Sequence, residues 1–212
     1  MKQGFIHKCS IASQLLISCL QLSTDLAADS NFRNIPAAQL QQSYTWYDGD
    51  IKREVWVNPQ LIAEFNPTIS QKNQISAAVT GAQVVSAKMG PVRFWQVNDT
   101  INAKTAISSI SKRMNSNQIS AVLHDGASTL SAMRAIPGNI IIYLDPGWDQ
   151  ATATQWLAQK NLQVVSQRQF MPNVFVIKSI PGLESLLMAN KLYESGEVVA
   201  AFPNWWKELV TK

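Results

Sequence analysis

One short run of the chain carries the residue types of acid–base chemistry. His124 is followed by Asp125 and Gly126, and an imidazole beside a carboxylate provides the base and the orienting acid that activate a nucleophilic hydroxyl. Such catalysis also needs a nucleophile set against the base, and nothing in the sequence supplies the other parts of the constellation. We therefore expect His124 to be a surface histidine at the end of a strand, next to a turn.

Other chemistries leave no pattern in the sequence either. No cluster of Cys, His, Asp and Glu has the spacing of metal ligands, and the glycines do not form a phosphate-binding loop. The net charge is only +4, and the densest basic spots are Lys52-Arg53 and Lys112-Arg113, so the basic stripe of a nucleic-acid-binding protein is missing. The sequence predicts a protein that is not an enzyme and that binds no cofactor, no metal and no nucleic acid.

The first 28 residues have the order of an export signal. Lys2 and Lys8 give a positive start, residues 11–22 form a short apolar core, and residues 26–28 (Leu-Ala-Ala) suit cleavage. The apolar stretch is too short to span a bilayer, and no later stretch reaches the required length. We expect an exported chain, secreted or periplasmic, with no membrane span. The alternative is a buried N-terminal helix.

Both cysteines, Cys9 and Cys19, lie inside this segment, so cleavage after residue 28 would leave neither a thiol nor a disulfide. The run from Leu16 to Cys19 also matches a bacterial lipobox, in which Cys19 would be lipidated and become the first residue. The following Leu20 and the rather polar apolar core favour simple secretion. A lipid anchor on Cys19 is the alternative.

From residue 61 onward the chain contains an internal repeat of about eighty residues. The run Gln-Val-Val-Ser at 83–86 recurs identically at 163–166. Three further matches keep the same order, with all offsets between 79 and 82: residues 63–67 with 142–146, 92–97 with 174–178, and 119–123 with 198–202. Four matches in one order at one offset are not expected by chance.

Each copy has the pattern strand, helix, strand, strand, helix, strand. In the second copy we expect strands at 139–144, 162–168, 174–178 and 198–202. Asp149 should cap the first helix, and Leu183, Leu186, Leu187 and Tyr193 should face the core from the second. This order is typical of a split βαβ, ferredoxin-like module, in which an antiparallel sheet carries two helices on one face. The other face is left to solvent or to a partner.

The first copy has the same pattern in weaker form. Ile75, Ala78 and Val79 suit its first helix, and Ile107, Ile110 and Met114 suit its second. A hairpin is expected before it, with strands at 45–47 and 54–57 and a turn at Asp48-Gly49.

Three segments of the second copy carry a family resemblance: residues 138–147 (GNIIIYLDPG), 172–178 (PNVFVIK) and 189–204 (ANKLYESGEVVAAFPN). The third is the most specific, with a helix that ends in Leu-Tyr-Glu-Ser-Gly and a strand that ends in Pro-Asn. Together they resemble the prodomain of secreted bacterial subtilisin-like serine proteases. Shorter runs at 47–49, 61–65 and 92–95 are similar to the longer leader of some such precursors, so the resemblance covers roughly residues 45–204.

The resemblance implies two linked activities, which are to help a cognate protease fold and to inhibit it once folded. The family's catalytic segments His-Gly-Thr and Gly-Thr-Ser do not occur, so proteolysis is not implied. In a prodomain the open sheet face packs on the protease, and the C-terminal tail lies in the substrate cleft as an added strand. The implied protease-binding residues are Phe202, Pro203, Asn204, Trp205, Trp206, Leu209, Val210, Thr211 and Lys212.

Within this tail, Leu209 would fill a hydrophobic pocket of the protease, and Lys212 would occupy the pocket beside the catalytic serine. The alternatives are an inert tail and, for Trp205 and Trp206, a hydrophobic plug against the end of the domain.

The sequence thus predicts an α+β protein of two tandem ferredoxin-like modules. Its segments are a signal peptide (1–28), a polar leader with a hairpin (29–60), a first module (61–126), a linker (127–137), a prodomain-like module (138–204) and a tail (205–212). The expected function is that of a stand-alone inhibitor and folding chaperone of a subtilisin-like protease. The alternatives are a remnant of a truncated precursor and an exported module that binds another partner.

Overall fold

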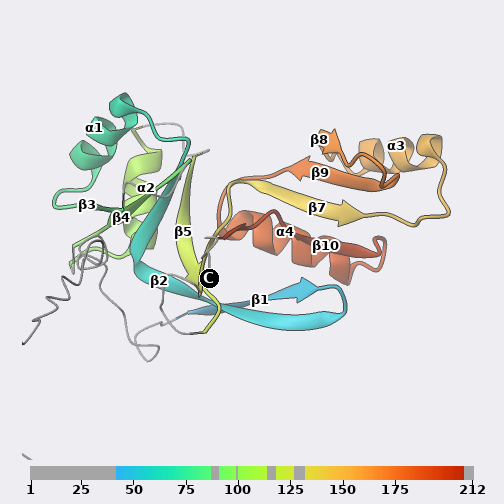
Figure 1. Cartoon of the computed structure of the whole chain (residues 1–212), viewed down its shortest axis with the longest axis horizontal. Coiled ribbons are helices and arrows are strands. Elements are labelled where there is room, and N and C mark those ends of the chain that lie inside the picture. Colours follow the sequence, from blue (N-terminus) through green and yellow to red (C-terminus); the bar gives the residue numbers. More distant parts are fainter. Residues whose placement is uncertain (1–41, 87–90, 99, 114–117, 127–131, 208–212) are drawn as a thin grey trace, which may run out of the picture. The chain divides into compact units, whose positions relative to one another are not determined.

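The computed structural model describes residues 42–86, 91–98, 100–113, 118–126 and 132–207. Within these residues the chain is a mixed α+β protein with two antiparallel sheets and four helices (Figure 1). We call the sheet built mainly from residues 43–135 the first sheet and the sheet built from residues 139–203 the second sheet.

A β-hairpin opens the described chain. Strand β1 (Ser43–Asp48) pairs antiparallel with β2 (Ile51–Phe65), so that Asp48 lies opposite Ile51. Gly49 occupies the turn at a φ of 60°, in the left-handed region that glycine adopts without a steric penalty. The predicted hairpin and its turn are therefore confirmed.

Strand β2 runs for 15 residues and joins two segments, 54–57 and 61–65, that the sequence suggests as separate strands. Its pairing with β5 (Ile119–His124) shifts register between Val57 and Ile62. Pro59, which has no N–H to donate, lies within this irregular part, where a sheet tolerates proline. One strand therefore serves both the hairpin and the first repeat.

The first repeat has the predicted order of elements. After β2 come α1 (Ile69–Ala78), β3 (Gln83–Ser86), β4 (Val92–Gln96), α2 (Ala103–Ser111) and β5, with the strand order β5-β2-β4-β3. Thr68 and Gln71 form a capping box that fixes the start of α1. Ile75 and Ile110 lie in the two helices as predicted, and both are fully buried, whereas Val79 is the C-cap residue just after α1. Met114 lies outside the described residues.

Two short strands extend the first sheet. Strand β6 (Met133–Ala135) pairs with β5, and β11 (Trp206–Lys207) pairs with β6. The sequence predicts a linker at 127–137 and a tail at 205–212 instead of these strands. Strands of three and two residues are too short to show a hydrophobic period. As a result, β5 lies inside the sheet, with β2 on one side and β6 on the other.

The second repeat contains β7 (Asn139–Tyr143), α3 (Gln150–Gln159), β8 (Val164–Gln167), β9 (Val174–Lys178), α4 (Leu183–Glu194) and β10 (Ala200–Pro203), with the strand order β10-β7-β9-β8. Asp149 caps α3 by accepting a hydrogen bond from the backbone N–H of Thr152, as predicted. Leu187 is 49% exposed rather than part of the core. Leu186 is fully buried, as predicted, and so is Ala189, which was not among the residues predicted to face the core.

In the strand registers, equivalent residues of the two repeats are separated by the same number of positions in the sequence. The residues that lie opposite one another across three strands are Ile62, Trp95 and Ala121 in the first sheet and Ile142, Phe175 and Ala201 in the second. Each residue of the second set follows its counterpart by eighty positions. The identical runs in β3 and β8 also shift register at the same place, between their first valine and their serine.

Each sheet packs its helices against one face. The cluster between the first sheet and its helices includes Ile62, Ile75, Trp95 and Ile110, and the cluster between the second sheet and its helices includes Ile142, Leu157, Phe175 and Ala189. The other face of the first sheet is also buried, in a cluster that includes Leu61, Phe65, Phe94 and Met133.

The hairpin also contacts α4. The rings of Tyr47 and Tyr193 lie 4.4 Å apart, and the Tyr47 hydroxyl donates to a carboxylate oxygen of Glu194 at 2.9 Å. Asn190 donates from its side-chain amide to the backbone oxygen of Thr45 at 2.7 Å. The hairpin is therefore held by side chains of the second repeat as well as by its own sheet.

Candidate functional site: a helix-free sheet face and the C-terminal strand

The second sheet has an apolar face on the side away from its helices. Side chains alternate between the two faces of a strand, and Ile140, Ile142, Phe175, Ile177 and Ala201 pack toward α3 and α4. The alternate residues define what we call the helix-free face: Ile141, Tyr143, Val174, Val176 and Phe202. Ile141 lies opposite both Val176 and Phe202 in the strand register, and the rings of Tyr143 and Phe202 lie 5.8 Å apart.

At its β8 edge, this face is more open than its counterpart in the first sheet, although Val174 and Val176 of β9 are buried. Val85 of β3 is 8% exposed and belongs to the buried cluster on the other face of the first sheet, whereas its repeat counterpart Val165 in β8 is 53% exposed. All four residues of β8 are exposed. An apolar sheet face that continues into an exposed edge strand is typical of a protein contact surface.

The chain after β10 crosses to the first sheet. The Asn204 N–H donates to the backbone oxygen of Asn139 at 2.8 Å, which holds Pro203 and Asn204 beside β7. Trp206 then lies opposite Ala135 in the β6–β11 pair, with its ring 5.3 Å from that of Phe94. The C-terminal segment thus leaves one sheet and joins the other.

Trp205 is fixed by a cluster of aromatic and charged groups. Its ring meets Trp46 edge to face at 5.2 Å, and the Arg134 guanidinium lies 5.2 Å from the centroid of each ring. A cation within about 6 Å of an indole is attracted by the π system. Arg134 is itself held by an ion pair of 2.5 Å with Asp125.

The structure places the predicted protease-binding residues in three settings. Phe202 lies on the helix-free face, and Pro203 and Asn204 end β10 beside β7. Trp205 and Trp206 pack within the chain, as in the alternative of a hydrophobic plug. The remaining residues, Leu209, Val210, Thr211 and Lys212, and the candidate lipidation residue Cys19, lie outside the described residues.

His124 is not the surface residue that the sequence suggests, because it is fully buried. Its Nε2 lies 3.0 Å from Nδ2 of Asn58, at the irregular part of β2. The burial follows from β6, which covers the side of β5 that a four-stranded sheet would leave at the edge. Asp125, the neighbouring acid, is paired with Arg134.

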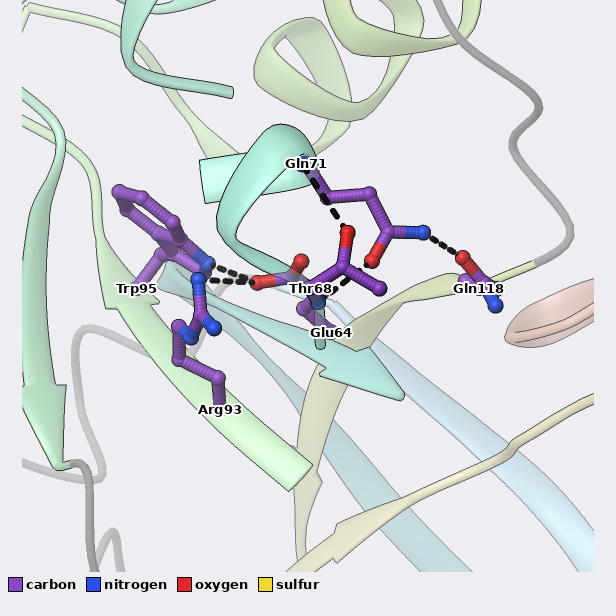
Figure 2. A network of polar contacts seen from close by, with 6 residues as sticks. All are labelled: Glu64, Thr68, Gln71, Arg93, Trp95 and Gln118. Carbon is purple, nitrogen blue, oxygen red and sulfur yellow. Dashed lines mark hydrogen bonds and ion pairs between the residues drawn. The ribbon is translucent and has the colours of Figure 1, made fainter. Parts of the chain in front are cut away.

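A buried carboxylate in the first repeat was not anticipated from the sequence (Figure 2). Glu64 has no exposed surface, and it accepts a hydrogen bond of 2.8 Å from Nε1 of Trp95. Arg93 lies opposite Glu64 in the strand register, and its Nη1 is 3.6 Å from Oε2 of Glu64. Burial raises the pKa of Glu64, and the bond from Trp95 and the charge of Arg93 only partly offset this effect.

The repeat offset supplies the signal that could have identified Glu64. Its counterpart eighty residues later is Leu144, which is buried against the helices of the second repeat. The first repeat therefore has a carboxylate at the position where the second repeat has a buried leucine. Gln71 links the same region to β5 by a hydrogen bond to the side chain of Gln118 (Figure 2). We interpret the contacts of Glu64 and Gln71 as structural contacts within the first repeat rather than as a binding site.

Within the described residues, no three side chains of Cys, His, Asp or Glu gather as they would around a metal ion. In the same part of the chain, no helix has both the length and the apolar character needed to cross a bilayer. Comparisons of the chain with models of protein families, with curated proteins and with solved structures found no match.

Proposed function

We propose that this chain is an exported binding protein, and not an enzyme, that inhibits a secreted subtilisin-like serine protease and helps it to fold. The proposal starts from the resemblance of residues 138–204 to the prodomains of such proteases. It includes the finer fold assignment of both repeats as ferredoxin-like modules. The strand orders β5-β2-β4-β3 and β10-β7-β9-β8 support that assignment, as does the packing of each helix pair on one sheet face.

The observation that carries the proposal is the helix-free face of the second sheet. Ile141, Tyr143 and Phe202 on this face are partly exposed, whereas Val174 and Val176 are buried. Phe202 belongs to the segment with the most specific resemblance, and it also packs against the cluster of Trp46 and Leu186. A flat apolar surface that excludes water can bind a protein partner of matching shape. On the protease this face would lie against the outer surface, away from the catalytic groups.

The second element of the proposal is the segment after Lys207. Because Trp205 and Trp206 contact Arg134 and Phe94 within the chain, the proposal does not place these two residues in a substrate cleft. We propose that residues 208–212 pair there as an added strand, with Leu209 and Lys212 in the pockets named above.

A second candidate function is that of an exported module that binds a different protein through the same face. It is favoured by the packing of Trp205 and Trp206 within the chain, because docking by the sheet face does not require the tail. Inhibition assays separate the two candidates.

The test compares four proteins: residues 29–212, a version ending at Lys207, and the variants Ile141→Glu and Leu187→Glu. The first variant places a charge on the helix-free face, and the second places the same charge at an exposed leucine of α4 as a matched control. Inhibition constants are measured against a panel of subtilisin-like proteases. The refolding yield of each denatured protease is measured with and without the chain. Circular dichroism confirms that every variant folds.

We expect Ile141→Glu to weaken inhibition at least about tenfold, as for a central apolar contact, and Leu187→Glu to change it less than about twofold. Weaker inhibition by the version ending at Lys207 would support the tail in the cleft. Rapid digestion of the chain without inhibition of any protease would contradict the proposal. If Ile141→Glu inhibited as strongly as residues 29–212 do, the helix-free face would not be part of the protease contact.

A further inference from the structure

A pocket lies at one end of the second repeat, apart from the helix-free face. It has a volume of about 500 Å³ and is formed by the loop after β7, by α3 and by the loop before β10. Its lining includes Asp145, Trp148, Trp156, Glu197 and Val199. No residue of the lining belongs to the helix-free face, so the proposed protease contact leaves the pocket unexplained.

The pocket's aromatic wall is held in place before any ligand binds. The rings of Trp148 and Trp156 lie 6.1 Å apart at an angle of 56°. Asn173 donates from its side-chain amide to the backbone oxygens of Asp145 and Trp148, at 2.7 and 2.9 Å. The Gly147 N–H donates to Oδ1 of Asp145 at 2.7 Å. The loop that carries Asp145 and Trp148 is therefore fixed by hydrogen bonds.

The wall already holds one cation of the chain itself. The Lys160 ammonium lies 5.8 Å from the centroid of the Trp156 ring and pairs with Glu197 at 2.5 Å. Trp156 donates from Nε1 to the same carboxylate at 3.1 Å. The hydrogen bonds from Lys160 and Trp156 lower the pKa of Glu197, which keeps this carboxylate ionised.

Asp145 provides a second carboxylate, and this one has capacity to spare. Its Oδ1 accepts the Gly147 N–H, whereas its Oδ2 has no hydrogen-bond partner among the described residues. With Asp145 and Glu197 negative and Lys160 positive, the charged groups at the pocket sum to one negative charge. An indole wall beside an uncompensated carboxylate is the combination that attracts organic cations.

We propose that this pocket binds an organic cation of the guanidinium or alkylammonium class. A guanidinium fits best, because its plane can stack on an indole face while its N–H groups donate to Asp145 Oδ2. The cation can be a free small molecule or an arginine or lysine side chain presented by a protein. The inference is independent of the proposed protease partner.

The test follows the indole N–H signals of Trp148 and Trp156 by nuclear magnetic resonance in the full chain. The probes are N-acetyl-arginine amide, N-acetyl-lysine amide and, as an uncharged control, N-acetyl-citrulline amide. Asp145→Asn removes the charge but keeps an oxygen for the Gly147 N–H. Glu54→Gln, at an exposed site on β2, is the charge-matched control far along the chain.

We expect saturable shifts with the arginine probe, an affinity about tenfold lower for Asp145→Asn, which corresponds to the loss of one charge-assisted contact, and no change for Glu54→Gln. The citrulline probe should bind at least about tenfold more weakly than the arginine probe. Equal binding of the two probes, equal binding to Asp145→Asn, or no saturable shift would overturn the proposal. A short peptide whose one charged group is an arginine side chain distinguishes a protein ligand from a free small cation. Tighter binding than the amide indicates a protein side chain, and equal binding indicates a small cation.

Discussion

Glu64 shows how one residue can set a pH dependence for the whole fold. Its carboxylate occupies the position that Leu144 fills in the second repeat, and it has no exposed surface. Oε1 has no hydrogen-bond partner among the described residues. The charged form therefore loses hydration without full compensation, which is the physical cause of its raised pKa.

The first prediction concerns the variant Glu64→Gln. Because the pKa of Glu64 is raised from 4.5 in the folded chain, the folded state binds this proton more tightly than the unfolded state does. The stability that the group contributes is fully present below pH 4.5 and is lost as the pH rises through the raised pKa. The free energy of unfolding of the native chain relative to Glu64→Gln should therefore fall as the pH rises from about 4 to about 8.

Urea unfolding of both proteins across this range measures the difference directly. Asp149 and Glu197, whose pKa values are lowered in the fold, act in the opposite direction and are common to both proteins, so they cancel in the comparison. A difference that stays constant with pH would show that Glu64 is not the group responsible.

At the scale of elements, β3 and β8 provide a comparison within one molecule. They share the sequence Val-Val-Ser and the same register shift, yet Val85 is buried and Val165 is exposed. Local sequence therefore fixes the form of the strand, while the neighbours decide how much stability each valine contributes.

The second prediction uses this pair. Val85→Ser should lower the free energy of unfolding by about 1 to 3 kcal/mol, because it removes buried apolar surface and places a hydroxyl there. Val165→Ser should change it by less than about 0.5 kcal/mol. Urea unfolding of the two variants tests the contrast, and equal losses would mean that the faces of the two sheets are covered alike.

The elements with a strong period were predictable from the sequence, and the irregular ones were not. Strand β9 has the predicted bounds, and Asp149 caps α3 as its side chain suggests. Strands β6 and β11 were missed because strands of three and two residues are too short to show a period. The burial of His124 was missed for the same reason, since β6 is what encloses it. Leu187 was misplaced because the apolar residues of α4 are spread around more than one side of the helix, which leaves two choices of inward face.

At the scale of the whole molecule, the C-terminal segment holds two sheets to each other. Arg134 contacts Trp46 of the hairpin and Trp205 of the segment after β10, and it pairs with Asp125 at the end of β5. The Nε1 groups of Trp46 and Trp205 have no hydrogen-bond partner among the described residues, and the contacts found in this cluster are those between rings and with the Arg134 cation. A single arginine thus joins three segments that are far apart in the sequence.

The third prediction is a double-mutant cycle on this cluster. Arg134→Ala and Trp205→Ala should each destabilise the chain, and their coupling energy should be about 1 to 2 kcal/mol because the cation–π contact is partly desolvated. The control cycle pairs Trp205→Ala with Lys160→Ala, whose cation lies over a different indole, and should be additive. Coupling in both cycles, or in neither, would contradict the direct contact.

The sheet-face site could be anticipated in outline, since the predicted fold leaves one face of the second sheet without helices. The packing of Trp205 and Trp206 could not, because no local pattern distinguishes an aromatic pair that plugs its own domain from one that meets a partner. The pocket at Trp148 and Trp156 combines two loops and a helix, and such a convergence is visible only in three dimensions.

The pairing of β11 with β6 has a consequence for synthesis on the ribosome. The first sheet begins with residues 43–48 but gains its outermost described strand only when residues 206 and 207 have been made. Until then β6 exposes an unpaired backbone edge, which is where nascent chains associate wrongly. The edge strand β11 can therefore join the first sheet only after the whole second repeat has been synthesised.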